Sequence, residues 1–181
     1  MTIVEPIRDI NKINQIKEIL KNKNLRDYLI FIMGINSGLR ISDILNLKVA
    51  DVIDKNYIQI IEQKTKKSKK FPISKTYQQE LNIFIKNKNP KEALFSGKNK
   101  NKSISRIQAY RIITSACKKA NIKVNIGTHT LRKTFGYHFY KKTKDIALLQ
   151  TILNHSSPKI TLRYIGINQE IIDLSLKSFD L

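Results

Sequence analysis

Apolar residues recur at helical spacing along most of this chain, and the pattern changes between residues 56 and 74. Ile13, Ile16 and Leu20, for example, fall on one face of a helix. Within the interruption, the stretches 57–62 and 70–73 predict two short strands joined by a basic loop. Helices are predicted near 11–22, 25–36, 41–47, 75–87, 103–120, 129–142, 144–154, 157–165 and 168–178. The chain is therefore expected to be mainly α-helical with one small antiparallel β-sheet, an α+β fold.

Several helix boundaries are marked by residues that commonly stop or start a helix. Ser37-Gly38 ends the second predicted helix, which is apolar on most sides and is therefore expected to be buried. Ser103 and Ser157, the latter followed by Pro158, are suitable starts for two later helices. With 181 residues, 41% hydrophobic and 27% charged, the chain fits a single globular domain over residues 1–181.

The sequence shows no sign of export or of membrane insertion. Its longest apolar run, Tyr28 to Ile35, is far below the roughly 20 residues of a membrane-spanning helix. Charged residues at positions 5, 8 and 9 interrupt any apolar core of a secretion signal. The single cysteine, Cys117, excludes an internal disulfide and a cysteine metal cluster. The cytoplasm is the expected compartment.

Basic residues strongly outnumber acidic ones. The net charge is +20, the pI is near 10.1, and lysine supplies 27 of the 34 basic residues. Because isoleucine and asparagine are also abundant, part of the lysine excess fits an AT-rich genome and a generally solvated surface. An excess of twenty positive charges nevertheless draws a protein to polyphosphates at moderate salt. Nucleic-acid binding is the favoured interpretation, with acidic membranes as the alternative.

Arg40 is a candidate phosphate ligand. Leu39 and Ile41 flank it, so its backbone enters the core region while its guanidinium group needs a partner. Asp43 lies on the same face, and a structural Arg40–Asp43 ion pair is one interpretation. The other is an arginine directed at a phosphate, because its planar fork can bind two oxygens at once.

The predicted hairpin loop carries a run of lysines. Lys64, at the junction of strand and loop, is the best placed to reach into bound DNA and donate a proton to a leaving oxygen. The others, including Lys66, Lys67 and Lys69, are expected to follow a phosphate backbone or simply to be solvated. A nuclear-localisation signal is a further interpretation of such a run.

The predicted helix 103–120 has a basic face. If this helix enters a DNA groove, Arg106 and Arg111 could read guanine edges. The alternative is a surface helix whose basic face is solvated.

Two histidines, an arginine and a tyrosine in the last third of the chain are further candidates. His129 and Arg132 are three residues apart at a predicted helix start, so both project from one face. For this spacing alone, a helix-start histidine beside a solvated arginine is the favoured interpretation. His155 follows an apolar helix, and a positive charge on His155 would stabilise the C-terminus of that helix. Tyr164, nine residues later, would ordinarily be a core residue, and His138 is interpreted as structural.

These residues occur in a characteristic order. Gly38-Leu39-Arg40-Ile41-Ser42-Asp43 is followed by Lys64, by His129-Thr130-Leu131-Arg132, and then by Leu153-Asn154-His155 and Tyr164. In this order and spacing the chain resembles the catalytic domain of the tyrosine recombinases, the phage integrase family, from about residue 7 to its end. One departure is Asn154, where the family has glycine; asparagine tolerates similar backbone angles.

The resemblance implies how a DNA strand would be cut. Tyr164 would attack a scissile phosphate and displace a 5′-hydroxyl, leaving a 3′-phosphotyrosyl link. Arg40 and Arg132 would neutralise the charge on the non-bridging oxygens. Asp43 would brace an active-site arginine or histidine.

The resemblance also implies three further roles. His129 would exchange a proton with the tyrosine, His155 would hydrogen-bond a non-bridging oxygen, and Lys64 would protonate the departing 5′-oxygen. Neither a metal ion nor another cofactor is implied.

Double-stranded DNA is the implied partner, in site-specific recombination of a phage or other mobile element. The apolar segment 170–181 is expected either to pass to a neighbouring protomer in a tetramer on DNA or to pack on its own domain. The N-terminal DNA-clamping domain typical of the family is expected to be missing. Type IB topoisomerase-like relaxation, or a DNA-binding or regulatory protein that has lost catalysis, are the alternative functions.

Overall fold

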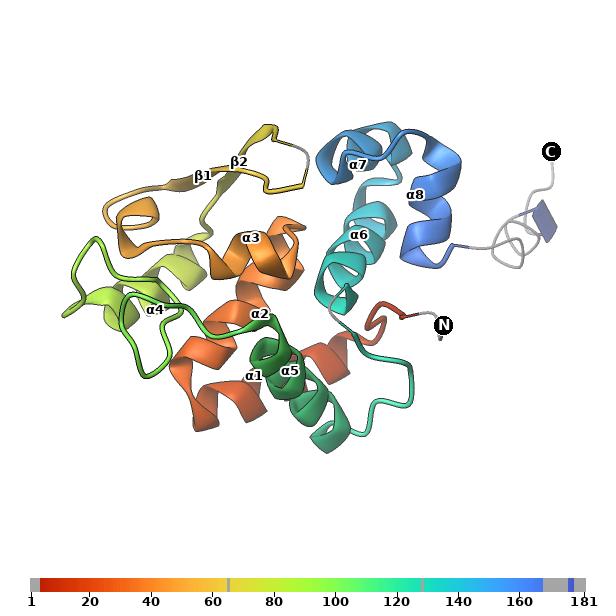
Figure 1. Ribbon diagram of the computed structural model, residues 1–181. Coiled ribbons are helices and arrows are strands. Elements are labelled where there is room, and N and C mark those ends of the chain that lie inside the picture. Colours follow the sequence, from red (N-terminus) through yellow and green to blue (C-terminus); the bar gives the residue numbers. More distant parts are fainter. Residues whose placement is uncertain (1–3, 65, 128, 168–175, 178–181) are drawn as a thin grey trace.

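The computed structural model describes residues 4–64, 66–127, 129–167 and 176–177, and it confirms a mainly helical fold with a two-stranded antiparallel sheet (Figure 1). In chain order the elements are α1 (Ile10–Lys23), α2 (Leu25–Ser37), α3 (Ile41–Leu45), the 3-10 helix η1 (Val49–Asp51), β1 (Tyr57–Ile61), β2 (Ser68–Pro72), α4 (Lys75–Ile85), α5 (Arg106–Lys119), α6 (Thr130–Thr143), α7 (Ile146–Leu153) and α8 (Pro158–Ile165). The predicted helix 168–178 lies outside the described residues, except for 176–177.

Helix α2 is the centre of the larger part of the molecule. All its residues from Tyr28 to Gly34 are buried, and it packs against α1, α3, α4, α5 and α6. Gly34 permits the close approach of α6, because a Cβ atom there would lie 2.5 Å from Cδ1 of Leu131. The apolar sequence of this segment predicts its central position correctly.

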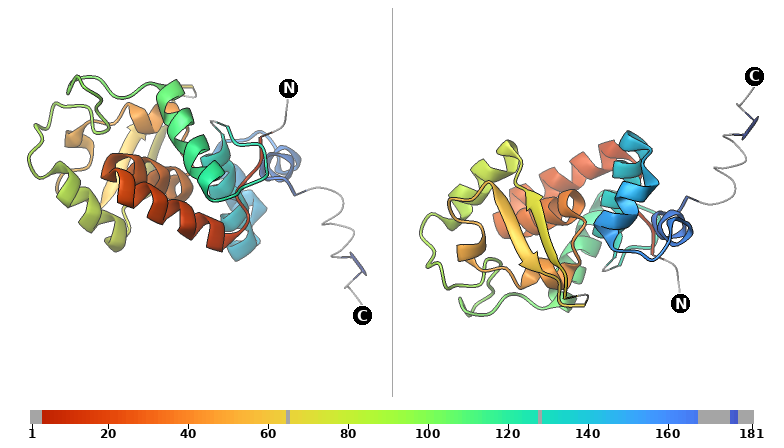
Figure 2. Two further views of the ribbon diagram at one scale, coloured as in Figure 1. Left: turned by 90° about the horizontal axis from the view of Figure 1, so that it is seen from below. Right: turned by 90° about the horizontal axis from the view of Figure 1, so that it is seen from above.

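Two hydrophobic clusters meet at α6. The larger cluster joins α1 to α5 with the hairpin and includes Leu131 of α6. The smaller cluster has a buried centre in α7, α8 and the residue after α8, and aromatic residues of α6 cover it; that centre is formed by Leu149, Leu153, Ile165 and Ile167. Figures 1 and 2 show α6, α7 and α8 together at one side of the molecule. The start of α6, which carries Arg132, therefore lies where the two clusters meet.

The hairpin lies between the larger cluster and the end of α7. Its strands pair antiparallel, from Tyr57 opposite Pro72 to Ile61 opposite Ser68. Ile58 is fully buried, so one face of β1 covers the core. On β2, Nζ of Lys69 donates a hydrogen bond to the carbonyl of Ile152 in α7. The second strand begins at Ser68, two residues earlier than predicted.

Helix α5 begins later than predicted. Its first residue is Arg106, and the side chain of Ser105 caps it. The hydroxyl of Ser103, the expected start, instead donates to the carbonyl of Phe95 at 3.0 Å. Ser157 caps α8 as expected. The difference at α5 arises because the preceding loop binds the Ser103 side chain and removes it from the helix end.

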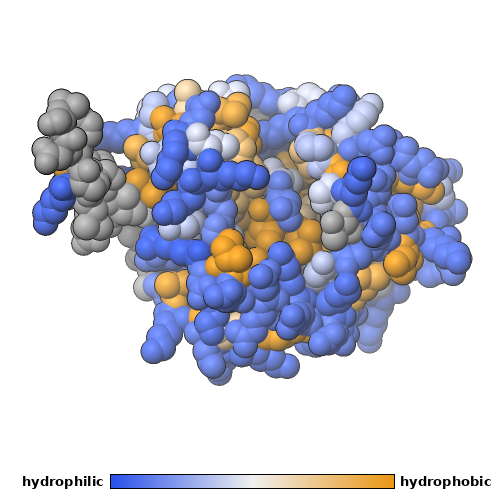
Figure 3. Space-filling model, turned by 180° about the vertical axis from the view of Figure 1, so that it is seen from behind, coloured by the Kyte–Doolittle hydropathy of each residue, from blue (hydrophilic) through white to orange (hydrophobic). Residues whose placement is uncertain are grey.

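The surface is mostly hydrophilic. Hydrophilic side chains cover most of the face in Figure 3, with separate hydrophobic groups between them. Exposed apolar side chains include Ile61, Ile83 and Ile107. No helix in the described part of the chain is both long and apolar enough to cross a membrane.

Candidate active site

Five of the six predicted catalytic side chains lie together, with Tyr164 at the centre. The other four are those of Arg40, His129, Arg132 and His155. The hydroxyl of Tyr164 is 3.3 Å from Nδ1 of His129, and its ring centroid is 4.8 Å from that of His155. Burial and the positive charges of Arg132 and Arg40 lower the pKa of both histidines, which places the arginines beside them. The link between α2 and α3, the start of α6, the link between α7 and α8, and α8 itself all contribute to this cluster.

Tyr164 and His129 have the geometry for proton transfer. Tyr164 is half-buried, and burial raises the pKa of its hydroxyl, although Arg132 and Arg40 oppose the shift. The phenol is therefore protonated at neutral pH and needs a base to become a nucleophile. Because the pKa of His129 is lowered, by burial first and by Arg132 next, its ring is neutral at pH 7 and can accept that proton.

Arg132 is only 2% exposed, and it is held by backbone carbonyls at the ends of α2 and α7. Its Nη1 donates to the carbonyl of Gly38, and its Nη2 donates to that of Leu153 at 2.6 Å. Gly38 ends α2 with a φ of 64°, a left-handed conformation that glycine adopts without strain. The helix break predicted at this glycine therefore also supplies a contact of the active site.

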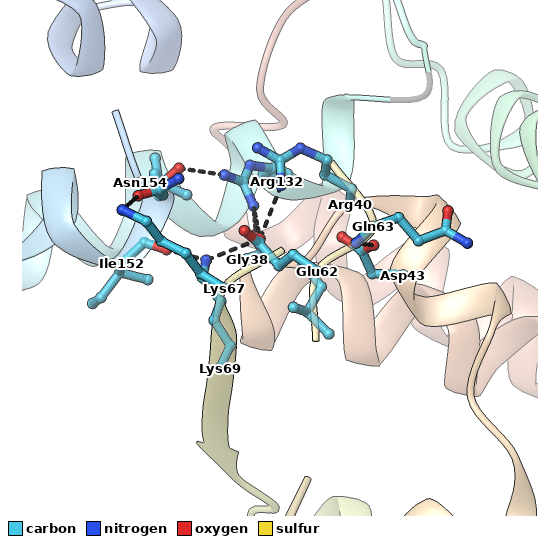
Figure 4. Close-up of polar contacts among 12 residues, drawn as sticks. Gly38, Arg40, Asp43, Glu62, Gln63, Lys67, Lys69, Arg132, Ile152 and Asn154 are labelled. Carbon is cyan, nitrogen blue, oxygen red and sulfur yellow. Dashed lines mark hydrogen bonds and ion pairs between the residues drawn. The ribbon is translucent and has the colours of Figure 1, made fainter. Parts of the chain in front are cut away.

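The carboxylate beside Arg40 is that of Glu62, which the sequence analysis did not single out. Nη1 of Arg40 lies 2.9 Å from Oε1 of Glu62, whose side chain is 0% exposed. Asp43, the partner of Arg40 in one of the two sequence interpretations, accepts a hydrogen bond from the backbone N–H of Gln63 at 3.0 Å. Asp43 therefore holds the turn after β1, which carries Lys64, against α3 (Figure 4).

Strand alternation could have identified Glu62. Ile58 and Ile60 face inward along β1, and a period of two continues through Glu62 just beyond the strand. In the sequence Glu62 is only the last residue of a predicted strand, and a carboxylate is rarely fully buried unless it is paired.

The lysines of the hairpin divide into an exposed and an inward-facing group. Lys64 and Lys66 are exposed. Nζ of Lys67 donates to Oδ1 of Asn154 at 2.9 Å. Lys69 faces inward, with Nζ 3.2 Å from Oε1 of Glu62, and burial is the main cause of its lowered pKa. Its charge is thus directed to the protein interior, and the prediction that Lys69 follows a phosphate backbone or is solvated is wrong.

A cleft of about 830 Å³ opens beside the cluster. Its lining includes Arg40, Lys64 and His129, together with the basic residues Lys102 and Arg106. Arg111 is exposed further along α5 and is not among the lining residues given for this cleft. Arg106 and Arg111 were both predicted to contact bases in a DNA groove, and of these two the structure places Arg106 at the cleft. Across the described ranges, no group of three or more His, Cys, Asp and Glu side chains is placed to hold a metal ion.

The replacement of glycine by asparagine at position 154 is compatible with the backbone. Asn154 ends α7 with a φ of 50°. We expect Asn154→Ala to lower the free energy of unfolding by roughly 1 kcal/mol, because alanine is strained in this conformation. Asn154→Gly should stay close to the wild type. Urea unfolding of the three proteins measures the difference, and equal values for the alanine and glycine variants would contradict this account.

The hydrogen bonds of His155 define which ring nitrogen carries its proton. Nδ1 lies 3.1 Å from Oγ1 of Thr161, and that hydroxyl donates its own proton to the carbonyl of Ser157 at 3.1 Å. Nδ1 of His155 is therefore the donor in this contact, and Nε2 has no proton when the ring is neutral. Donation to a phosphate oxygen through Nε2 then requires that the ring takes up a second proton.

The lowered pKa values of His129 and His155 should make the DNA-free protein less stable in mild acid. Burial, with Arg132 and Arg40, lowers the pKa of His155 to about 4 in the folded state, against 6.5 for the ordinary side chain. The unfolded chain therefore binds the proton first, and stability falls as the pH drops from about 6.5 toward about 4. Thermal melts between pH 7 and 5 should show this fall, with a shallower slope for His155→Asn. An unchanged slope would contradict the assignment.

Comparison with known proteins identifies the family of this chain. The phage integrase family matches residues 8–170. A probable integrase/recombinase of Bacillus subtilis (strain 168), YoeC, is 54% identical over 179 residues, which are 99% of this chain and 98% of YoeC.

Two solved structures share the fold. The crystal structure of XerA recombinase matches with a TM-score of 0.79 and 20% identity, covering 100% of this chain and 68% of that one. A lambda integrase tetramer bound to a Holliday junction matches with a TM-score of 0.70 and 14% identity, covering 91% of this chain and 49% of that one. With a family match over most of its length and a relative of nearly equal length, the chain belongs to the phage integrase family of tyrosine recombinases.

Proposed function

We propose that this chain cuts and rejoins DNA strands in site-specific recombination, with Tyr164 as the nucleophile. The observation that carries the proposal is the contact of the Tyr164 hydroxyl with His129, at 3.3 Å, among two arginines and beside an open cleft. A half-buried phenol, a neutral imidazole that can accept its proton and two cations beside it are groups that can carry out a transesterification at phosphorus.

The first step transfers the phosphate from DNA to the protein. Oη of Tyr164 gives its proton to Nδ1 of His129 and forms a bond to the scissile phosphorus. The bond from phosphorus to the 5′-oxygen breaks, and Lys64 protonates that oxygen as it leaves. Arg40 and the N–H groups of Arg132 that are not bound to carbonyls stabilise the charge on the non-bridging oxygens. The reverse reaction, with a new 5′-hydroxyl as nucleophile, rejoins the strand without an external energy source.

The proposal includes the partners and the setting of the reaction. Its substrate is double-stranded DNA, met in the cytoplasm and belonging to a phage or other mobile element. Arg106 and the exposed lysines of the hairpin contact the DNA around the cleft. Several protomers act together on DNA, with the C-terminal segment 170–181 as their contact, a segment that lies outside the described residues apart from 176–177.

Suicide DNA duplexes test this function. A duplex nicked close to the cleavage position loses a short fragment after cutting, so the 3′-phosphotyrosyl adduct accumulates and survives denaturation. We expect an adduct and, on paired sites, recombinant products. Plasmid relaxation without recombinants would replace the proposal by a type IB topoisomerase activity. DNA binding without an adduct on any substrate would indicate a protein that has lost catalysis.

A further inference from the structure

The carboxylate of Glu62 joins three cationic side chains that come from distant parts of the sequence. Oε1 lies 2.9 Å from Nη1 of Arg40, 3.2 Å from Nζ of Lys69 and 3.7 Å from Nη1 of Arg132. Figure 4 shows these side chains converging from the α2–α3 link, from β2 and from α6. The active-site arginines therefore share one acidic partner.

Because the Glu62 carboxylate is buried, it strongly restricts where the guanidinium groups of Arg40 and Arg132 can lie. The side chain of Glu62 is 0% exposed, and those of Arg40 and Arg132 are 17% and 3% exposed. Charges removed from water are tolerated only when they are paired with good geometry. Because two neighbouring guanidinium groups repel each other, a carboxylate between them allows both to stay in the same small volume.

Glu62 is also connected to the turn that carries the proposed general acid. It directly follows β1 and precedes Lys64 by two residues. The intervening residue, Gln63, is bound through its N–H to Asp43. The position of the Lys64 backbone is therefore fixed by two contacts, one from Glu62 to the arginines and one from Gln63 to α3.

We propose that Glu62 is a positioning residue for strand cleavage. Its carboxylate holds the guanidinium groups of Arg40 and Arg132 in the arrangement that receives the scissile phosphate, and it sets the turn of Lys64 beside them. The inference rests on the proposed function. Glu62 acts through the arginines, so its removal affects the rate of cleavage much more than the binding of DNA.

Lys69 gives a way to separate positioning from folding. Glu62→Gln keeps the size of the side chain and removes its charge, but it leaves the half-buried Lys69 without a carboxylate. In the double variant Glu62→Gln/Lys69→Gln both charges are absent, so the fold should recover much of the stability that the single variant loses. The arginines still lack their acidic partner in both variants.

The matched control is a partly buried carboxylate outside the site. Glu80 pairs with Lys21 at 2.5 Å, and its side chain is 14% exposed. Glu80→Gln removes one negative charge in a similar setting, away from the arginines. It should lower the melting temperature while the cleavage rate stays within about threefold of the wild type.

Single-turnover cleavage of saturating suicide DNA, together with the Kd for non-covalent binding, tests the inference. For the folded double variant we expect cleavage to be roughly 10- to 100-fold slower, as misplaced catalytic groups cause, with a Kd within about threefold of the wild type. Cleavage at the wild-type rate, or a loss in binding as large as the loss in rate, would overturn the positioning role. If the wild type itself forms no adduct, the proposed function fails first; if it does, only the role of Glu62 is at stake.

Discussion

Tyr164→Phe is expected to abolish the covalent protein–DNA adduct while DNA binding persists. The change removes only the hydroxyl, so the ring can keep its contact with His155 at a centroid distance of 4.8 Å. Without Oη there is no nucleophile for the phosphorus and no proton for His129 to accept. Loss of a nucleophile typically lowers turnover on the order of 10⁴-fold or more. Denaturing gels of suicide-DNA reactions, with a parallel binding assay, measure both effects.

Tyr57→Phe is the matched control for this variant. Tyr57 lies on β1 and is 41% exposed, and Nζ of Lys70 lies 3.7 Å from its ring centroid. The same single-atom change there should leave adduct formation at the wild-type level. An adduct formed by Tyr164→Phe would show that another side chain attacks the DNA, and the assignment of the nucleophile would be wrong.

Arg132→Ala is expected to have the largest effect on stability together with a large effect on cleavage. The substitution leaves the carbonyls of Gly38 and Leu153 without this donor and removes one cation from the surroundings of Glu62. Breaking a buried charged network of this kind costs about 3–5 kcal/mol. Loss of a transition-state donor lowers the rate on the order of 10²–10³-fold. Urea unfolding and single-turnover cleavage below the melting temperature measure the two effects separately.

Two further variants serve as comparisons for Arg132→Ala. Arg132→Lys keeps the charge but not the fork that reaches two carbonyls at once, so it should fall between alanine and the wild type in both measurements. Arg106→Ala, at an exposed arginine of the cleft, should change stability by no more than about 0.5 kcal/mol and should weaken DNA binding. If Arg132→Ala had the same free energy of unfolding as Arg106→Ala, the buried network around Arg132 would be contradicted.

The sequence predicts the helices well, because helical spacing is a pattern that the chain carries locally. The catalytic role of the polar residues that the structure brings together stays a prediction. Helical spacing identifies α2 as buried, and the order of the polar residues identifies the side chains around Tyr164. The same reasoning offers Asp43 as one possible partner of Arg40, because the two are three residues apart. In the structure Glu62 lies beside Arg40, since a strand can bring a side chain to a helix that is distant in sequence.

Lys69 shows why the direction of a side chain in the hairpin could not be predicted from the sequence. Its direction depends on the register of the hairpin, in which Lys69 lies opposite Ile60 and therefore on the inward face. That register depends on the turn between the strands, and a slip of one residue would direct Lys69 to solvent. In sequence it is one lysine in a basic run; in the structure its ammonium group contacts Glu62 and the carbonyl of Ile152.

Mapping the residue that carries the DNA tests the central claim most directly. The adduct formed on a suicide duplex is digested with nuclease and trypsin, and the modified peptide is identified by mass spectrometry. Since trypsin cleaves after Arg163 and Lys177, the account predicts a nucleotide on the peptide 164–177, or on a longer peptide that contains it, attached to Tyr164. A nucleotide on a peptide without Tyr164, such as one that contains Tyr137 or Tyr140, would contradict it.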